Sequence, residues 1–196
     1  MTVLVVPAAT KPIVSQGDGR AQQHVSEFFA GLGEVANGRY YGAASGAEFT
    51  HDAINARSSL IRITFDLVPV SNAVDLHLIA RTGNKESVTA YSWSRPYNDG
   101  AATFVGLTDT SDPQIILAAA VQNHATAGGI AGVVTIHNIQ SARYKRVSGE
   151  AVGYDGSRER VNVIGGRIDT ALPITGVQLR FSSGDIASGY VRVDAP

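Results

Sequence analysis

The sequence predicts a mainly β protein: a jelly-roll-like antiparallel β-sandwich with an N-terminal extended arm and one helix. Three observations predict this class. Apolar and polar residues alternate with a period of two from residue 60 onward. Turn-forming residues separate the alternating segments at regular intervals. The chain also has 21 glycines and only 17% charged residues, a composition typical of short strands joined by tight turns.

The first predicted unit, residues 1–56, combines an arm and a helix for docking and oligomerisation. Residues 1–17 are expected to be extended, because the apolar run TVLVV is broken by Pro7. This start lacks a basic leader, and its apolar run is too short for a secretory signal. The candidate docking arm comprises Val3, Leu4, Val5 and Val6.

A helix is predicted over residues 20–35, where apolar residues recur at spacings of three and four. Asp18 is a suitable N-cap for this helix of about four turns. Asn37 and Gly38 suit its end, because both tolerate a left-handed backbone. Residues 38–56 show no clear period, so we expect a long connection there with room for a short strand.

The second predicted unit, residues 57–196, is the β-sandwich domain. In LIRITFDLV, Ile61, Ile63 and Phe65 share one face of a strand, while Arg62 and Thr64 share the other. The same pattern continues in segments separated by turns such as PVSNA and RTGNKES. The expected strands cover residues 60–68, 74–80, 88–94, 103–107, 113–121, 130–139, 144–154, 160–168, 176–183 and 189–195.

Charge and cysteine content exclude several classes of partner. The net charge is −1 and the pI is about 6.5, so no long-range field attracts nucleic acid or an anionic membrane. No segment approaches the roughly 20 apolar residues of a membrane helix. The chain has no cysteine, which excludes disulfides and thiolate metal sites. The five histidines lack metal-ligand spacing, and His77 and His137 occupy solvent-side positions of their predicted strands.

Signals for catalysis are weak. The sequence has no G-x-S-x-G motif, and the loop SSGDIASG is typical of a turn that joins two strands. The acids that a glycosidase would need lie in predicted loops and are better explained as turn formers. These candidate acids are Asp109, Asp112, Glu150 and Asp155. We therefore predict no catalytic residue, no cofactor and no metal site.

An aromatic cluster is the remaining signal for binding. Tyr91 and Trp93 share one face of a predicted strand, Tyr97 follows, and Arg95 can stack beside them. Such a cluster can hold a sugar ring through apolar stacking and hydrogen bonds at its rim. The alternative is that Trp93 anchors the core between the two sheets. The candidate glycan contacts are Tyr91, Trp93, Arg95 and Tyr97.

The ordered series of fragments over residues 57–193 resembles a module of bacteriophage virion proteins. The quoted marks are R-T-G-N (Arg81 to Asn84), Y-x-W (Tyr91 and Trp93), a strand ending in Asn138, Gly165-Gly166, and the closing segment from Phe181 to Gly189. The resemblance implies a jelly-roll-like sandwich of the kind found in tail fibres and other exposed particle proteins. The family pattern often closes with Leu-Tyr-Gly, whereas this chain ends Val-Asp-Ala-Pro.

The resemblance implies a non-catalytic structural component of a bacteriophage virion, assembled in the host bacterial cytoplasm. It implies a tail-associated fibre or receptor-binding protein that forms a homotrimer and contacts other virion proteins and a host surface glycan. The first alternative is a capsid decoration protein that stabilises the shell. More distant alternatives are a carbohydrate-active enzyme on a jelly roll and a cellular carbohydrate-binding module.

Overall fold

The computed structural model of the chain describes residues 39–54, 57–98, 104–123 and 128–196. These residues form twelve strands and no helix. The predicted arm and the predicted helix of residues 20–35 lie outside the described residues. In chain order the strands are β1 (Arg39–Ala43), β2 (Phe49–His51), β3 (Leu60–Pro69), β4 (Val74–Thr82), β5 (Tyr91–Asn98), β6 (Phe104–Asp112), β7 (Ile115–Val121), β8 (Ile130–His137), β9 (Lys145–Tyr154), β10 (Glu159–Ile168), β11 (Ile174–Phe181) and β12 (Ile186–Asp194).

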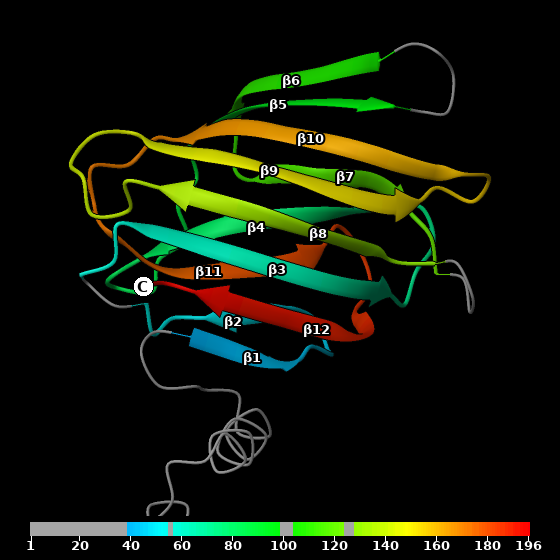
Figure 1. Ribbon diagram of the computed structural model, residues 1–196, viewed down its shortest axis with the longest axis horizontal. Coiled ribbons are helices and arrows are strands. Elements are labelled where there is room, and N and C mark those ends of the chain that lie inside the picture. Colours follow the sequence, from blue (N-terminus) through cyan, green and yellow to red (C-terminus); the bar gives the residue numbers. More distant parts are fainter. Residues whose placement is uncertain (1–38, 55–56, 99–103, 124–127) are drawn as a thin grey trace, which may run out of the picture.

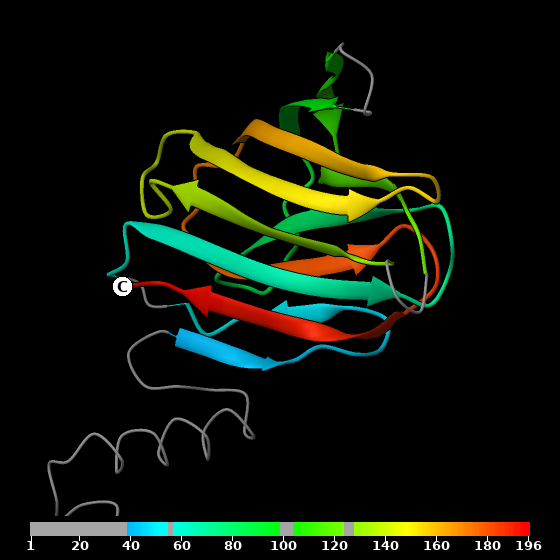
Figure 2. The same cartoon turned by 45° about the vertical axis from the view of Figure 1, so that its right-hand side comes forward.

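The strands form two antiparallel sheets that pack as a sandwich. The large sheet has eight strands in the order β1-β12-β3-β8-β9-β10-β5-β6, and the small sheet has four in the order β2-β11-β4-β7. In Figures 1 and 2 the small sheet lies behind the middle strands of the large sheet. Strand β1 and the β5–β6 hairpin form the two opposite edges of the large sheet. The predicted mainly β, two-sheet antiparallel architecture is therefore confirmed.

Alternating side chains build the core between the sheets. In β3, Ile61, Ile63 and Leu67 have no exposed surface, while Arg62 and Thr64 face solvent. The small sheet contributes Leu76 and other inward residues of β4 and β11. Burying such a side chain stabilises the fold by about 1.5–3 kcal/mol. Because a strand turned the other way would expose its apolar side chains, the period-two pattern determines which face of each strand points into the sandwich.

Residues 38–56 contain more regular structure than the sequence indicated. Strand β1 pairs with β12, and β2 pairs with β11, so each adds an edge strand to one sheet. Tyr40 packs between them, with its ring centroid 5.1 Å from that of Phe49 and 5.3 Å from that of His51. Strands of five and three residues are too short to show a clear alternation, which explains why the sequence predicted mainly a connection.

Buried polar groups fasten the two sheets and their loops to each other. The Ala80 backbone N–H donates a 2.8 Å hydrogen bond to the Tyr91 hydroxyl, which joins β4 of the small sheet to β5 of the large sheet. The Lys145 ammonium is buried at the start of β9. It donates to the carbonyl oxygens of Ser141 and Thr170 at 2.8 and 2.6 Å, and so connects two loops at one end of the sandwich.

Gly189 has a backbone geometry in the closing hairpin that favours glycine. Its φ is +146°, and a Cβ atom at this position would overlap the backbone carbonyl of Asp66 on β3. A side chain at Gly189 would therefore crowd the neighbouring strand β3. The segment from Phe181 to Ile186 is a turn in which the Ser182 hydroxyl accepts a 3.0 Å hydrogen bond from the Asp75 N–H.

Candidate functional site

The four residues predicted to contact a glycan all lie on β5, but most of them point into the molecule. Tyr91, Trp93 and Arg95 are 0%, 7% and 2% exposed, and Tyr97 is half-buried. The Trp93 indole Nε1 donates a 3.2 Å hydrogen bond to the Asp112 carboxylate. Trp93 thus anchors the core, as the alternative interpretation of the sequence held. The assignment of the four residues to glycan contact stays a prediction.

Arg95 and Tyr97 form a polar cluster with β10. The Arg95 guanidinium donates a 2.6 Å hydrogen bond to the Asn162 side-chain oxygen, and burial lowers the pKa of Arg95. The guanidinium carbons of Arg95 and Arg160 lie 5.4 and 5.2 Å from the Tyr97 ring centroid, within the range of cation–π attraction. The predicted stacking of Arg95 beside an aromatic ring is therefore confirmed for Tyr97.

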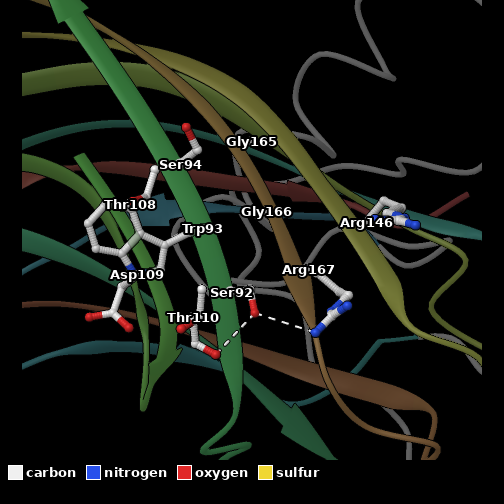
Figure 3. Close-up of a pocket in the computed structure, with 10 residues that line it drawn as sticks. All are labelled: Ser92, Trp93, Ser94, Thr108, Asp109, Thr110, Arg146, Gly165, Gly166 and Arg167. Carbon is white, nitrogen blue, oxygen red and sulfur yellow. Dashed lines mark hydrogen bonds between the residues drawn. The ribbon is translucent and has the colours of Figure 1, made fainter. Parts of the chain in front are cut away.

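A groove lies on the large sheet, where β5 and β6 meet β10 and β9. It is open to solvent and has a volume of about 580 Å³. Figure 3 shows side chains from β5 and β6 on one side of it and arginine side chains from β10 and β9 on the other. The groove is lined by Ser92, Trp93, Ser94, Thr108, Asp109, Thr110, Arg146, Gly165, Gly166 and Arg167. Only Trp93 of the four predicted residues is among them.

Gly165 leaves the groove open. A Cβ atom built there would have only the Ser94 carbonyl oxygen within 4.0 Å, so any side chain would occupy the groove. The next residue differs: a Cβ at Gly166 would meet the Ser92 carbonyl oxygen at 3.1 Å and the Ile115 side chain at 3.3 Å. Gly166 therefore marks a close approach between neighbouring elements, whereas the space over Gly165 is open.

Two arginines face each other across neighbouring strands at the groove. Arg167 of β10 is directly opposite Arg146 of β9. Arg167 pairs with Asp169 through its Nε, 2.6 Å from Oδ1, and donates a 2.9 Å hydrogen bond from Nη2 to Oδ2. Its guanidinium also covers the Tyr144 ring at 4.4 Å from the centroid. Like charges directly opposite each other destabilise a sheet, and Asp169 neutralises only one of them.

The opposite side of the groove is rich in hydroxyl groups. Ser92 donates a 3.2 Å hydrogen bond to the Thr110 carbonyl oxygen and accepts a long, 3.5 Å one from Arg167, both drawn in Figure 3. Asp109 is exposed, and its carboxylate accepts a 2.8 Å hydrogen bond from the Ser111 N–H. Asp109 is directly opposite Trp93, so its side chain shares the face of Trp93, whereas Ser94 and its partner Thr108 share the groove face. The hydroxyls on the groove face can both donate to and accept from a ligand.

The other candidate acids serve mainly as structural groups. Asp112 accepts hydrogen bonds from Trp93 and from the Gln114 N–H, and Asp155 caps the β9–β10 turn. Burial alone would raise the pKa of Asp155, but hydrogen bonds from Ser157 and Arg158 and the charge of Arg160 lower it to about 2. The sequence placed all four acids in loops, which is wrong for Asp109, Asp112 and Glu150 because they lie on β6 and β9.

The three histidines that the structure describes divide between buried and half-buried positions. His77 points away from the core of the small sheet as expected, yet neighbouring side chains leave it only 6% exposed. Its burial lowers its pKa against the opposing attraction of Asp75. His137 is half-buried, with Nε2 3.1 Å from the Ser148 hydroxyl. Within the described ranges, no three His, Cys, Asp or Glu side chains lie close enough together to hold a metal ion.

Comparisons with known proteins leave the fold and this groove as the basis for interpretation. No protein-family model, curated protein or solved structure matched the chain. In the part of the chain that the structure describes, no helix is long and apolar enough to cross a membrane.

Sequence reasoning missed the residues that line the basic side of the groove. Arg146 and Arg167 lie on the outward positions of their strands, and the alternation of KRVSGEAVGY and RVNVIGGRI contains that information. Their meeting with β5 depends on the strand order, which brings residues 92–94 beside residue 165. The exposed Tyr144 ring beside Arg167 was missed for the same reason.

Proposed function

We propose that this protein is a non-catalytic structural component of a bacteriophage virion, displayed on the particle surface as a tail-associated fibre or receptor-binding protein. Its described domain would be a jelly-roll-like version of the β-sandwich. Residues 1–38 would connect it to the particle, with Val3, Leu4, Val5 and Val6 as the docking arm. The protein would assemble as a homotrimer in the host cytoplasm before it joins the virion.

The residues that carry the resemblance support this proposal, because several of them lie at or beside positions with a positive φ. Asn138 follows β8 with a φ of +60°, a conformation that asparagine tolerates better than most residues. The R-T-G-N segment ends β4 and begins a turn whose next residue, Lys85, has a φ of +61°. Gly184 and Gly189 of the closing segment also have positive φ values. These quoted residues therefore lie at turns and strand ends whose backbone favours asparagine or glycine.

The observation that carries the proposal is the order of the strands in the large sheet. Residues 1–38 precede β1, which is one edge of that sheet, whereas β5 and β6 form the opposite edge. The groove lies beside β5, near the edge of the sheet that is opposite β1. Attachment through the N-terminal segment would therefore leave the groove directed away from the particle, as a receptor-binding surface requires.

A flat apolar patch favours the second candidate, a capsid decoration protein. Val152 of β9 lies directly opposite Val161 of β10, and Val163 lies two residues further along the same face. These side chains are 42%, 42% and 45% exposed. Apolar patches on soluble proteins often mark contacts with other proteins. The patch suits a neighbouring capsid subunit as well as the proposed homotrimer.

Localisation on purified particles tests the proposed function. We expect immunogold labelling or cryo-electron microscopy to place the protein on the tail, in copies related by threefold symmetry. Location on the head would support the decoration role instead. Absence from particles would reject both roles.

Deletion of residues 1–17 tests the proposed anchor. We expect the truncated protein to fold, as judged by an unchanged circular dichroism spectrum, and to be missing from purified particles. Incorporation at the normal level would contradict the role of the arm.

A further inference from the structure

We infer that the groove over Gly165 binds a carboxylate-bearing saccharide, with Arg146 and Arg167 on the acidic group and the β5–β6 hydroxyls on the sugar. This inference rests on the proposed receptor-binding function and names the class of receptor. It places the ligand on the outward side of β5, whereas the aromatic residues predicted from the sequence mostly lie on the inward side.

The lining of the groove favours a saccharide over a peptide. Ser92, Ser94, Thr108 and Thr110 present hydroxyls, a set that can donate to and accept from a polyhydroxylated ligand. A peptide bound as an added strand needs an unpaired strand edge. Strand β5 is paired with both β10 and β6, and β10 is paired with both β9 and β5, so the floor of the groove offers no such edge. The free edge at this end of the sheet is the outer edge of β6.

The charges indicate an acidic saccharide. Arg146 is exposed, and the described residues provide it with no ion-pair partner. Arg146 lies directly opposite Arg167 on the neighbouring strand. The charge of Arg167 is already balanced by Asp169. A ligand carboxylate would relieve the repulsion between the arginines and form charge-assisted hydrogen bonds. The rim-exposed position of Arg146 leaves it free to meet such a ligand.

Tyr144 extends the surface beyond one sugar unit. A second hollow, about 460 Å³ in volume, includes Tyr144 and Asp169 in its lining. Both residues contact Arg167, which lines the first groove, so the second hollow lies next to the first. The Tyr144 ring is 54% exposed and can stack on a sugar. We therefore expect an oligosaccharide to bind more tightly than its monosaccharide.

Calorimetric titration of the full chain tests the inference with matched probes. The acidic probes are oligogalacturonate and oligosialate, the neutral probes are their methyl esters, and hexaglutamate is the acidic peptide. We expect the unmodified protein to bind at least one acidic oligosaccharide, and to bind its methyl ester at least ~10-fold more weakly, since a charge-assisted contact is lost. Hexaglutamate should bind weakly, because it offers no hydroxyl partners.

Two variants and two controls connect the binding to the groove. Gly165→Val fills the groove and should abolish saccharide binding, while Arg146→Gln should weaken it by about 10-fold or more. Gly106→Val is the matched control, because a Cβ at Gly106 meets nothing within 4 Å, much like one at Gly165, and this residue lies outside the groove lining. Arg62→Gln removes an exposed arginine from β3 of the same sheet. Both controls should bind like the unmodified protein.

Several outcomes would overturn the inference. These are no binding of either acidic oligosaccharide, equal binding of the methyl esters, and binding unaffected by Gly165→Val. Hexaglutamate binding that is as tight and equally sensitive to Gly165→Val would assign the groove to an acidic peptide instead. The titrations use the isolated protein, so they are independent of particle localisation. A protein that binds the saccharide but is absent from virions would keep the groove assignment and reject the virion role.

Discussion

Strand β5 contributes to both faces of the large sheet, and its two sides differ in what their polar groups contact. On the inward side, Trp93 and Arg95 are buried and bound to Asp112 and Asn162. On the outward side, Ser92 and Ser94 line an open groove. The comparison teaches that the largest side chains of this strand serve stability, while its small hydroxyl residues face the space where a ligand fits. Substitutions on the two sides should therefore affect different measurements.

The largest expected effect is on the inward side, at Trp93. Trp93→Ala should lower the free energy of unfolding by about 3–5 kcal/mol, because it removes a buried ring and leaves a cavity. Urea unfolding followed by circular dichroism measures this loss. Ser94→Ala is the control on the outward side of the same strand, and its effect should stay within about 0.5 kcal/mol. A stable Trp93→Ala protein that only loses glycan binding would reverse the comparison.

The next effect concerns the buried guanidinium of Arg95. Asn162→Ala removes the acceptor of its 2.6 Å hydrogen bond and should cost about 2–3 kcal/mol, because a hydrogen bond to a charged group is lost. Asn162→Asp keeps an acceptor of the same size and adds a compensating charge, so it should be less destabilising than Asn162→Ala. Chemical unfolding of both variants measures the difference. Equal losses for the two variants would show that packing, and not the Arg95 contact, explains the role of Asn162.

How far the sequence predicts this molecule depends on whether a feature is local or needs the strand order. The alternation in β3 is local, and the positions of Ile61, Ile63 and Phe65 in the core followed from it. The special backbone of Gly189, which lies on β12, was also predictable, because a glycine in a polar segment indicates such a backbone. The short strands β1 and β2 were mostly missed, since three to five residues carry little periodicity.

The candidate site was harder to predict for a physical reason. Tyr91 and Trp93 suggested a binding surface because large rings can stack on sugars, but large rings also give the most stability when buried. Alternation groups Tyr91 and Trp93 on one side of β5 without identifying the covered side. The groove further needs Arg146 and Gly165 from two strands far along the chain, and their place beside Ser94 follows only from the pairing of β9, β10 and β5.

A smaller effect is expected at the β9–β10 turn, which lies away from both sides of β5. The pKa of Asp155 is lowered to about 2 in the folded protein from its ordinary value of 3.8. The ionised carboxylate therefore stabilises the fold above pH about 4, and this contribution is lost as the pH falls from about 4 to 2. Asp155→Asn should cost about 1–2 kcal/mol at pH 7. Unfolding measured at pH 7 and pH 2.5 should show this difference shrinking, and a constant difference would contradict the assigned pKa.

The smallest effect on stability is expected at Gly165, and it gives the sharpest form of the comparison. Gly165→Val points its side chain into the open groove, so the free energy of unfolding should change by less than about 0.5 kcal/mol. Gly166→Val points toward the Ser92 carbonyl and Ile115, and overpacking there should cost about 1–3 kcal/mol. Thermal unfolding of the two variants compares neighbouring residues of identical chemistry on opposite sides of β10. Equal destabilisation would mean that Gly165 has a structural role, and the loss of binding in Gly165→Val would then no longer identify the groove as the binding site.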